Sequence, residues 1–447
     1  MKLLDATTNR VTTGVQRHLP ESFVIAVGLT VFIMVMAMVV EGTGPLEVIQ
    51  LYGGAFWDLL AFSMQIAMLL LTGYILANTP LVDRGLTAVS SRIHDPRFAA
   101  AVATFAGALG TWINAGFGLV VGVILARKFA KEIPGLHYPL AVAGGYAGYS
   151  LYGIGLSGTI PLTIATPGHI LEEEMGLIAH ADTVFHPIVL GTSIAVIFGL
   201  PLLVAMLHPK NPKAVIEADP AALVDEVERT PELPDRIGGL ADRLNNSPLI
   251  GWFMGLLGLT YTVTYFVGGG VVDFNIINLT FLFLGILLFG RPTDYLACVR
   301  VSTKVVSGIL IQYPMYAGIM GVLAGSGLMV TMAGVFVSFS TPDTLPFFSF
   351  ISGGIINVFA PSGGAQWAIQ GPVMIEAAQQ MGADPGATAI GVAMGDQWTN
   401  AIQPFWILPV LAISGIRLRD VMGYLVPVLI FLGIVYGAAM LLLGYTA

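Results

Sequence analysis

Apolar segments long enough to cross a membrane recur along the chain and are separated by short polar segments. Residues 22–40, 184–207 and 424–443 each approach the ~20 consecutive apolar residues that a helix needs to span a hydrocarbon core. The composition agrees, because 55% of the 447 residues are hydrophobic and only 10% are charged, whereas soluble domains carry roughly 25% charged residues. The pattern therefore predicts an all-α polytopic membrane protein.

Two apolar regions are interrupted by polar, glycine-rich sequence. In the second, residues 345–381, the stretch NVFAPSGGAQWAIQGP from Asn357 places glycine, proline, serine and asparagine between apolar flanks. Lipid offers no hydrogen-bond partner, so non-helical backbone at membrane depth has to be buried in protein or to line a wet cavity. We therefore expect residues 98–126 and 345–381 to form re-entrant hairpins, each of which enters and leaves the membrane on one side.

Lysine and arginine are confined to alternate connections between the apolar segments. The runs 41–47 and 268–273, which would face the other way, contain neither residue. The positive-inside rule then places the N-terminus in the cytoplasm and predicts about nine spanning helices in the cytoplasmic (inner) membrane. The segment before residue 22 lacks a short apolar core with a cleavage site, so we expect it to be uncleaved. The basic clusters are Lys2/Arg10/Arg17, Arg84/Arg92/Arg97, Arg127/Lys128/Lys131, the loop 208–247, Arg291/Arg300/Lys304 and Arg417/Arg419.

The two halves of the chain resemble each other weakly when one is displaced by about 246 residues. The displacement brings TFAGALGTWINAGFGLVVG, from Thr104, over SFISGGIINVFAPSGGAQW, from Ser349, so that the two expected hairpin tips coincide. It also brings YSLYGIGLSGTIPL, from Tyr149, near DQWTNAIQPFWILPV, from Asp396, and we expect both to be helices broken within the membrane. In the topology above the two copies have opposite orientation, which is typical of inverted-repeat secondary transporters.

These elements divide the chain into four expected regions. Residues 1–207 would form the first inverted repeat, 208–247 a charged cytoplasmic loop, 248–268 a connector helix and 269–447 the second inverted repeat. Each repeat would contain one hairpin, near 98–126 or 345–381, and one broken helix. The charged loop carries no catalytic or phosphate-binding motif, so we interpret it as a solvated linker rather than a binding tail.

The sequences PSGGAQWAIQGP (361–372) and GDQWTNAIQPFW (395–406) resemble the short-chain fatty acid transporter family, also called the acetoacetate and short-chain fatty acid uptake family. FWDLLAFSMQIAMLLLTGYILA (56–77), INAGFGLVVG (113–122) and LSGTIPL (156–162) follow in family order, so the resemblance covers nearly the whole chain. It implies the fold of the wider ion transporter superfamily, with inverted repeats, two hairpins and two broken helices around one site. It also implies secondary active uptake of small monocarboxylates such as acetoacetate or butyrate. The chain departs from the family pattern at Ala365 and Gln366, where a third glycine and a histidine can occur.

Four helix ends are expected to meet near the centre of the molecule. They are the second arms of the hairpins, starting near Gly118 and Gln366, and the resumed halves of the broken helices, starting near Gly158 and Gln403. Each helix N-terminus carries roughly +0.5 of a charge and unpaired N–H groups, which suits a carboxylate. Residues 98–126 and 345–415 contain no lysine or arginine, so neutral groups would hold the anion. The candidates are Asn114, Gly116, Gly118, Ser157, Thr159, Asn357, Ser362, Gly363, Gly364, Thr399, Asn400 and Gln403.

Each of these residues also has a purely structural interpretation. A single asparagine or serine in a membrane helix commonly bonds a neighbouring helix, and glycines serve close packing or tight turns. Asp396 differs, because an ionisable group at membrane depth costs about 2.5–3.5 kcal/mol on insertion scales and is usually functional. We expect Asp396 to couple transport to a proton or a sodium ion, and its alternative is a cap at the unwound turn.

Other classes of function lack their motifs in this sequence. There is no H-E-x-x-H, no paired aspartate motif and no G-x-S-x-G with partners, so we do not expect an enzyme. The single cysteine, Cys298, excludes an internal disulfide and a cysteine-rich metal site. A channel would not need two opposed hairpins, but a dicarboxylate carrier or a sodium/proton antiporter of the same fold remains open. The expected partners are a short-chain monocarboxylate, a coupling ion and the lipid bilayer, with homo-oligomerisation open and no cofactor, firm metal site or nucleic acid.

Overall fold

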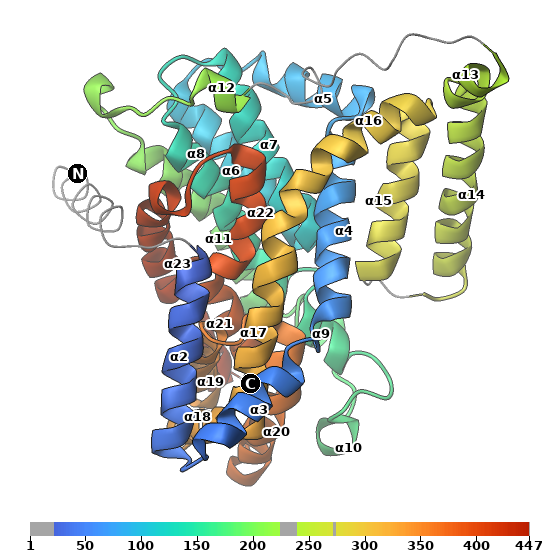
Figure 1. The fold of residues 1–447 in the computed structure, drawn as a ribbon. Helices are drawn as coiled ribbons and strands as arrows, with labels where there is room; N and C mark the ends of the chain where they lie inside the picture. The colour runs from blue at the N-terminus through green and yellow to red at the C-terminus, as the bar shows by residue number, and fades with distance from the viewer. Residues whose placement is uncertain (1–21, 224–238, 271–273, 447) are drawn as a thin grey trace.

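The regular elements of the protein are helices throughout the described part of the chain (Figure 1). The computed structural model describes residues 22–223, 239–270 and 274–446. The basic cluster Lys2/Arg10/Arg17 and part of the charged loop, 224–238, lie outside these residues. The prediction of an all-α polytopic membrane protein is confirmed.

The elements are α2 (Ser22–Val40), α3 (Pro45–Ala55), α4 (Leu60–Ala77), α5 (Pro80–Ser90), α6 (Pro96–Ile113), α7 (Ala115–Glu132), α8 (Tyr138–Ala147), η1 (Gly148–Ile154), α9 (Thr159–Ile164), α10 (Glu172–Met175), η2 (His180–Asp182), α11 (Pro187–Leu207), η3 (Pro212–Ala214) and α12 (Pro220–Leu223). They continue as α13 (Leu240–Asn245), α14 (Pro248–Val267), α15 (Phe274–Phe289), α16 (Pro292–Ser302), η4 (Thr303–Val306), α17 (Ser307–Gly325), α18 (Leu328–Val337), α19 (Leu345–Asn357), α20 (Gly363–Met381), α21 (Pro385–Asn400), α22 (Pro404–Ser414) and α23 (Leu418–Thr446). The prefix η marks 3-10 helix.

Within the described ranges, four helices are both apolar and long enough to cross a membrane: Phe23–Val40, Pro187–Leu207, Pro248–Val267 and Leu418–Thr446. A fifth candidate is the pair α17 and α18, which bend by 65° at their junction. The bend falls at Gly327, whose φ of 84° is a left-handed conformation that glycine adopts without strain. Other segments are shorter, such as α15 with 16 residues, or end at a break within the membrane. The count of about nine spans therefore stays a prediction.

Both predicted hairpins are present, and they lie toward opposite ends of the molecule (Figure 1). Helices α6 and α7 form the first and turn at Asn114, whereas α19 and α20 form the second and turn through residues 358–362. The second arms begin at Ala115 and Gly363, three residues earlier than we expected from the sequence. The reason is that Asn114 and Ser362 take the N-cap positions of α7 and α20.

Glycine lets the first hairpin pack closely on itself and on α8. A β-carbon on Gly118 would lie 2.0 Å from the backbone nitrogen of Thr111 in α6. A β-carbon on Gly107 or Gly122 would lie 2.4 Å or 2.7 Å from the carbonyl oxygen of Gly145 in α8. These distances leave no room for a side chain, so the three helices touch backbone to backbone. The first hairpin and α8 therefore form one tightly packed block.

Both predicted broken helices are present as well. The first runs through α8 and η1 to Ile154, breaks at residues 155–158 and resumes as α9, and the second ends with α21 and resumes as α22 at Pro404. The two helices pack against each other, because η1 contacts α21 and a β-carbon on Gly153 would lie 2.5 Å from Cγ of Gln397. The breaks are thereby brought together with the hairpin tips.

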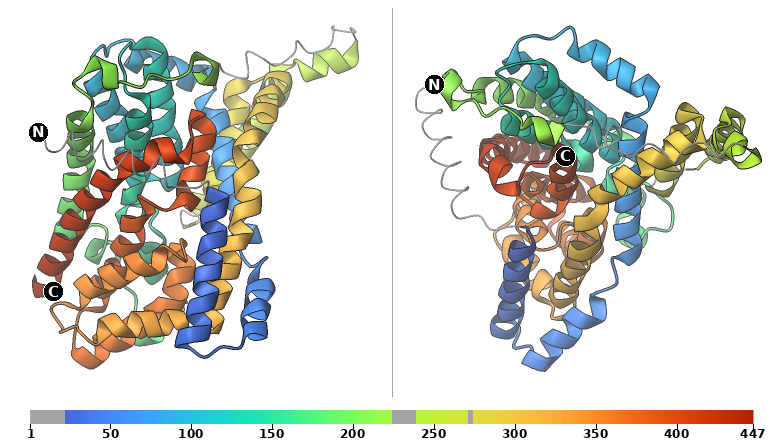
Figure 2. Two further views of the ribbon diagram at one scale, coloured as in Figure 1. Left: turned by 60° about the vertical axis from the view of Figure 1, so that its left-hand side comes forward. Right: turned by 45° about the horizontal axis from the view of Figure 1, so that its top comes forward.

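The helices form an inner group and an outer group (Figures 1 and 2). The hairpins and broken helices pack with α11 and α23 in the inner group, in which α11 contacts α6 and α8 while α23 contacts α8, α19 and α21. The outer group contains α2, α3, α4 and α14–α17, with α17 against α2, α3 and α4, and α14 against α15. The groups meet where α4 contacts α7 and where α17 and α2 contact α22.

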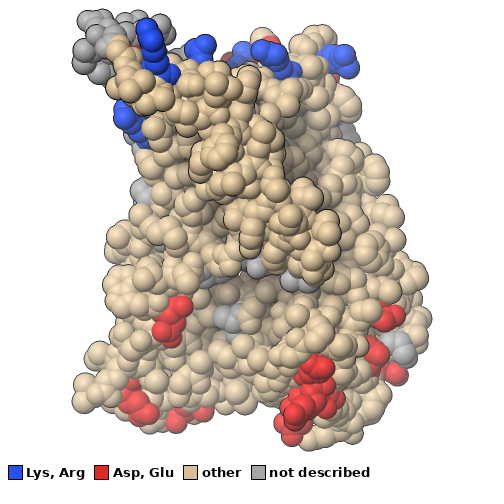
Figure 3. Space-filling model, turned by 90° about the vertical axis from the view of Figure 1, so that its right-hand side faces the viewer, with Lys and Arg blue, Asp and Glu red and all other residues tan. Residues whose placement is uncertain are grey.

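Charge is segregated along the long axis of the molecule. On the face shown in Figure 3, lysine and arginine gather at one end and aspartate and glutamate lie toward the other. The lysine and arginine end is the end at which Figure 1 shows α5, α12, α13 and α16, and we call it the basic end. Such asymmetry is what the positive-inside rule expects of a membrane protein.

The order of elements in the second half repeats that of the first at nearly constant spacing. Helices α3, α4 and α8 each begin 247 residues before α16, α17 and α21, respectively. In both halves a hairpin precedes a broken helix, and α14 falls between the halves. The division into inverted repeats 1–207 and 269–447, with 208–247 as cytoplasmic loop and 248–268 as connector, stays a prediction.

The opposed hairpins predict opposite labelling of their outer ends. Single cysteines at Pro134 and Gln380, both exposed, are to be introduced in a Cys298→Ala background and treated with an impermeant thiol reagent in oriented vesicles. Gln380 is preferable to Gly382, whose φ of 76° would strain a cysteine. We expect Pro134→Cys to react from the cytoplasmic side and Gln380→Cys from the other. Reaction of both from one side would contradict the opposed arrangement.

Candidate functional site

The tip of the second hairpin lies against both broken helices. A β-carbon on Gly363 would lie 3.3 Å from Oδ2 of Asp396 in α21, and one on Gly364 would lie 3.2 Å from Cγ2 of Thr159 in α9. The start of α20 is therefore seated directly against an acidic side chain and a threonine. Ser362, the N-cap residue of α20, is 7% exposed and makes no capping hydrogen bond with its side chain.

The tip of the first hairpin is tied to the break between η1 and α9. The side chain of Asn114 accepts a hydrogen bond from the backbone N–H of Phe117 at 3.1 Å and so caps α7. The backbone N–H of Ala115, the residue after Asn114, donates to Oγ of Ser157 at 3.1 Å. The N–H of Leu156 donates to the carbonyl of Trp112 at 2.8 Å. The non-helical segments of the tip and the break thus satisfy each other's backbone groups.

Two of the helices that begin at this centre are long enough to carry a full helix dipole. Helix α7 has 18 residues and α20 has 19, and each begins at a hairpin tip. Helix α9 has 6 residues, so its field is weaker. Gly116 lies buried in the first turn of α7, whereas Gly118 is in contact with Thr111 and serves the packing of the hairpin.

Four of the predicted residues, Asn357, Thr399, Asn400 and Gln403, form a connected network instead of lining the tips. Nδ2 of Asn357 lies within hydrogen-bond distance of Oγ1 of Thr399 at 3.0 Å and Oδ1 of Asn400 at 2.8 Å, and also of the carbonyl of Asp396 at 2.7 Å. Thr399 donates to the carbonyl of Gly354 at 2.8 Å. These contacts lock the first arm of the second hairpin onto the end of α21.

Gln403 completes this network at the start of α22. Its Nε2 donates to the carbonyl of Val358 at 2.7 Å and lies 3.3 Å from the carbonyl of Asn357. Its Oε1 accepts from the N–H of Phe405 at 3.3 Å and from the hydroxyl of Tyr316 in α17 at 3.3 Å. Gln403 therefore caps α22, holds the hairpin turn and reaches the outer group.

Asp396 lies at the meeting point of these elements. It is 3% exposed, and its Oδ2 accepts a hydrogen bond from Nε2 of the neighbouring Gln397. Its Oδ1 is buried and has no hydrogen-bond partner among the described residues. Tyr149 and Tyr152 of η1 lie within electrostatic range of the carboxyl group. The hydroxyl of Tyr152 pairs with that of Thr159, which itself touches Gly364.

Sequence reasoning missed a row of tyrosines beside the site. Tyr146, Tyr149 and Tyr152 stack in series, with ring centroids 6.3 Å and 5.7 Å apart, and Trp406 packs on Tyr149 at 5.1 Å. The hydroxyl of Tyr146 donates to the carbonyl of Asn400, so the row spans from the end of α21 to Thr159. The spacing of three residues in YAGYSLY was the available signal, because residues three apart share one side of a helix.

A second missed feature is a chain of amides within the second hairpin. Nε2 of Gln366 donates to Oε1 of Gln370 at 2.8 Å and to the carbonyl of Gly353 at 2.9 Å. Nε2 of Gln370 donates in turn to Oγ of Ser352 at 2.9 Å. The two glutamines join α20 to α19, and their four-residue spacing in an apolar helix was the sequence signal.

An apolar cavity of about 270 Å³ opens beside the network. Thr399 and Gln403 supply its polar wall, and the remainder comes from α2, the second hairpin turn, the break and α23. The lining residues are Ile25, Leu29, Val358, Thr399, Ile402, Gln403, Pro404, Met422 and Val426. The cavity lies where the outer helix α2 faces the inner group. Within the described ranges, no group of three or more His, Cys, Asp or Glu side chains is arranged to hold a metal ion.

A family model described as short chain fatty acid transporter matches residues 3–443, which is nearly the whole chain. The chain belongs to the short-chain fatty acid transporter family. The motifs at residues 361–372 and 395–406 thus indicate a transporter and not an enzyme.

Two bacterial relatives match this family member over almost their full length. A protein of Escherichia coli (strain K12) named "Putative short-chain fatty acid transporter" is 38% identical over 427 residues, which cover 95% of this chain and 97% of the relative. A protein of the same name from Haemophilus influenzae is 35% identical over 429 residues, covering 94% and 96%.

Two solved transporter structures are similar to this family member at lower identity. The YdaH transporter of Alcanivorax borkumensis has 17% sequence identity and a TM-score of 0.48, with 95% of this chain and 98% of that chain covered. MtrF of Neisseria gonorrhoeae, described as illuminating a class of antimetabolite efflux pumps, has 13% identity and a TM-score of 0.42, with 97% of both chains covered.

The close packing of the first hairpin predicts that Gly118→Ala destabilises the protein. The added methyl group meets the backbone of Thr111, and overpacking of this kind costs about 1–3 kcal/mol, so the thermal unfolding midpoint in detergent should fall. Gly85→Ala in α5 is the matched control, because nothing lies within 4 Å of its added carbon. An unchanged midpoint for Gly118→Ala, with transport lost, would instead assign Gly118 to substrate binding.

Proposed function

We propose that this transporter carries a short-chain monocarboxylate, such as acetoacetate or butyrate, across the cytoplasmic membrane together with a proton or a sodium ion. The observation that carries the proposal is Asp396, a buried acidic side chain seated against the tip of the second hairpin. Membership of the family supports the class of substrate.

The carboxylate would be held by neutral groups at the tips. The starts of α7 and α20 each contribute a partial positive charge, the start of α20 has no side-chain cap on its N–H groups, and Asn114, Ser157, Thr159 and Ser362 lie beside the two starts. No lysine or arginine occurs in 98–126 or 345–415. Since no fixed cation holds the anion, its affinity would be modest, which suits a carrier that must also release its substrate.

A carboxylate in this site would need a companion cation. Two unit negative charges about 4 Å apart repel by roughly 4 kcal/mol at an effective dielectric constant of 20, so ionised Asp396 would oppose the substrate. Entry of an anion against a negative interior costs a further ~2.3 kcal/mol per 100 mV. A proton or sodium ion on Asp396 would remove both the repulsion between the two carboxylates and the cost of moving a net negative charge inward. This is the physical basis of the proposed coupling.

The surroundings of Asp396 offer oxygen atoms of the kind that hard cations bind. Oδ1 of Asp396 and Oδ1 of Asn357 are buried without hydrogen-bond partners in the described part of the chain. The side chain of Asn357 lies beside the backbone of Asp396, because its Nδ2 donates to the carbonyl of that residue. Carboxylate and amide oxygens suit a hard cation, while a carboxylate alone suits a proton, so separate ion gradients distinguish the two.

The apolar cavity beside Thr399 would receive the acyl chain. Thr399 follows Asp396 by three residues in α21, an axial rise of about 4.5 Å, which a short acid can bridge. The cavity of about 270 Å³ equals the volume of about nine water molecules at roughly 30 Å³ each. Butyrate has six non-hydrogen atoms, so the cavity has room for a short acyl chain.

The coupling proposal predicts that Asp396→Asn separates accumulation from exchange. The variant keeps the shape of the side chain but loses the group that takes up the ion. In proteoliposomes it should fail to concentrate labelled butyrate under either a proton or a sodium gradient, while exchange of internal for external substrate persists in part. Asp384→Asn is the matched control, because Asp384 is exposed and an asparagine can still cap α21.

Two results would contradict the coupling proposal. One is wild-type accumulation that is indifferent to both gradients. The other is an Asp396→Asn variant that still concentrates butyrate as the Asp384→Asn control does.

The cavity proposal predicts that Val426→Phe shortens the preferred substrate. A larger side chain in the cavity leaves less space for the acyl chain, so competition by five- and six-carbon acids should fall several-fold while propionate competes as in the wild type. Ile430→Phe is the matched control, one helical turn further along α23 and 59% exposed. Uptake of labelled butyrate with unlabelled competitors is the measurement.

The same assay separates substrate classes. Stronger competition by succinate or citrate than by butyrate in the wild type would favour a dicarboxylate or tricarboxylate carrier. An identical chain-length profile for Val426→Phe and Ile430→Phe would place the acyl chain elsewhere.

A further inference from the structure

Two buried histidines lie at the basic end of the molecule, away from the proposed substrate site. His137 is 1% exposed and precedes α8, and His208 is 3% exposed and follows α11. Their rings are edge to face with centroids 6.3 Å apart, and His137 also packs on Tyr424 of α23 at 5.1 Å. The pair therefore joins three helices of the inner group.

The segment after α11 is fastened to this histidine pair, and we call residues 209–223 the strap. Ile216 is the main point of attachment. Its N–H donates to Nδ1 of His137 at 2.9 Å, and its carbonyl accepts from the N–H of Tyr138 at 2.9 Å. The next residue, Glu217, accepts a hydrogen bond from the N–H of Gly135 at 2.6 Å. The strap thus covers the loop 133–137, which joins the first hairpin to α8.

The hydrogen bonds require both imidazole rings to be neutral. In His137, Nδ1 accepts from Ile216, so the single ring hydrogen is on Nε2 and is donated to the hydroxyl of Tyr424. In His208, Nε2 accepts from the N–H of His137 at 3.1 Å, and Nδ1 donates to the carbonyl of Pro209 at 3.2 Å. Each ring therefore uses its one acceptor nitrogen to hold a backbone N–H group.

Protonation would turn each of these acceptors into a donor. A hydrogen on Nδ1 of His137 would face the N–H of Ile216, and a hydrogen on Nε2 of His208 would face the N–H of His137. We propose that the strap is an acid-released latch, in which protonation of His137 detaches Ile216, protonation of His208 detaches the backbone of His137, and the loop 133–137 is freed. The strap is the movable element and the histidine pair is the sensor.

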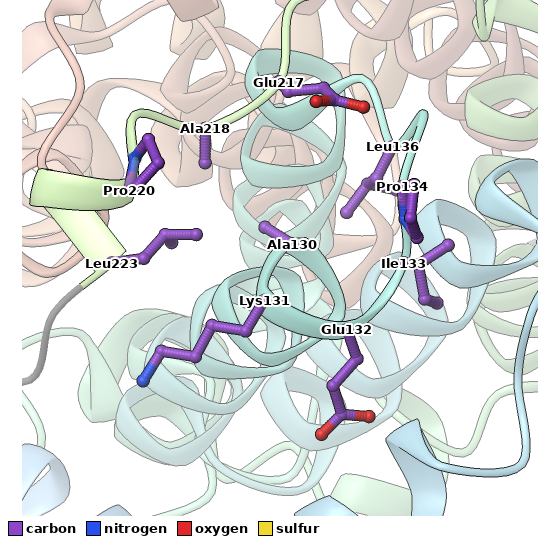
Figure 4. Close-up of a pocket in the computed structure, with 10 residues that line it drawn as sticks. All are labelled: Ala130, Lys131, Glu132, Ile133, Pro134, Leu136, Glu217, Ala218, Pro220 and Leu223. Carbon is purple, nitrogen blue, oxygen red and sulfur yellow. The ribbon is translucent and has the colours of Figure 1, made fainter.

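Beyond Glu217 the strap lies over a cavity and is anchored again at Leu223, which is 8% exposed. A cavity of about 530 Å³ separates it from the end of α7 (Figure 4). Ala130, Ile133, Pro134 and Leu136 line one side, and Ala218, Pro220 and Leu223 line the other. Because a cavity takes the place of close packing beside Ala218 and Pro220, the bonds at Ile216 and Glu217 fasten the part of the strap that covers the loop 133–137.

Burial supports the direction of the switch. It lowers the pKa of His137 from 6.5 to about 4, with a smaller contribution from His208, and it lowers the pKa of His208 as well. Since the closed strap holds the lower pKa values, its stability is full above pH 6.5 and is lost as the pH falls toward 4. Near the pair, Arg97 and Asp95 of α6 act on His208 with opposite signs. The other titratable groups beside the pair are Tyr424, Tyr138, Arg127 and Glu217.

Release of the strap would reach the substrate site through the first hairpin. The freed loop 133–137 joins α7 to α8, and these helices carry Asn114 at one tip and lead to Ser157 at the break. If the freed loop no longer holds the hairpin tip and the break in a fixed geometry, transport would slow. If the basic end is cytoplasmic, as the sequence predicts, the latch would reduce uptake when the imported acid has acidified the cell interior.

Thiol labelling at Leu136 tests the latch directly. Leu136 is 2% exposed beneath the strap, whereas Pro134 is exposed in the same loop. In a Cys298→Ala background, the labelling rate of Leu136→Cys divided by that of Pro134→Cys corrects for the pH dependence of the thiol. When the pH falls from 7.5 to 5.5, we expect this ratio to rise about tenfold. Protonation of His137 alone accounts for this rise, because its pKa is about 4 in the closed state and returns to 6.5 in the released state.

Two variants and one control identify the sensor. His137→Asn and His208→Gln each retain an acceptor near the original nitrogen but cannot be protonated, so the double variant should lose the rise. His94→Asn is the matched control, because His94 is exposed in the connection between α5 and α6 and should leave the rise intact. If Leu136→Cys does not fold, Leu223→Cys, 8% exposed in the strap, replaces it. A ratio that is constant with pH, or a rise that persists in the double histidine variant, would overturn the latch. The assay needs no substrate, so its outcome is independent of the proposed function.

Discussion

Backbone hydrogen bonding at the non-helical centre is the constraint on which the rest of the structure depends. Four segments leave the helical conformation inside an apolar molecule: two hairpin tips and two breaks. Each unsatisfied backbone group in such surroundings costs several kcal/mol. Ser157 and the carbonyl of Trp112 serve the first tip and its break, and Gln403 serves the second turn. The tips and breaks therefore occur together because each supplies the partners that the other lacks.

This constraint divides the polar residues of the centre into two sets. Asn357, Thr399, Asn400 and Gln403 bond mainly to one another and to backbone carbonyls, so they hold the fold in place. Oδ1 of Asp396 is buried without a partner among the described residues, and the start of α20 has no side-chain cap. A site built this way would be preorganised by the first set, and the second set would be left for the proposed ligand and ion.

The sequence predicted the fold well where a strong physical signal exists. Apolar length, the alternation of basic clusters and glycine-rich interruptions predicted helices, hairpins and breaks, because each follows from the properties of lipid. The sequence placed the second hairpin arms three residues late, since the N-cap positions of Asn114 and Ser362 are decided by local geometry. The row from Tyr146 to Tyr152 and the attachment of Ile216 to His137 were not foreseen. Both depend on contacts between segments distant in the chain, which a pattern along one segment does not contain.

The close glycine contacts among α6, α7 and α8 also bear on how the protein is assembled during synthesis. These three helices are consecutive, and Gly107, Gly122 and Gly145 lie within a short stretch of chain. Local contacts form early and at small entropic cost, so this block can pack before the second half leaves the ribosome. The contact between Gly153 and Gln397 joins residues from the two halves and can form only afterwards. The proposed site, which needs Asp396 beside η1, is thus completed later than the first hairpin, and a chain stalled between the halves would carry a finished first hairpin but lack Asp396.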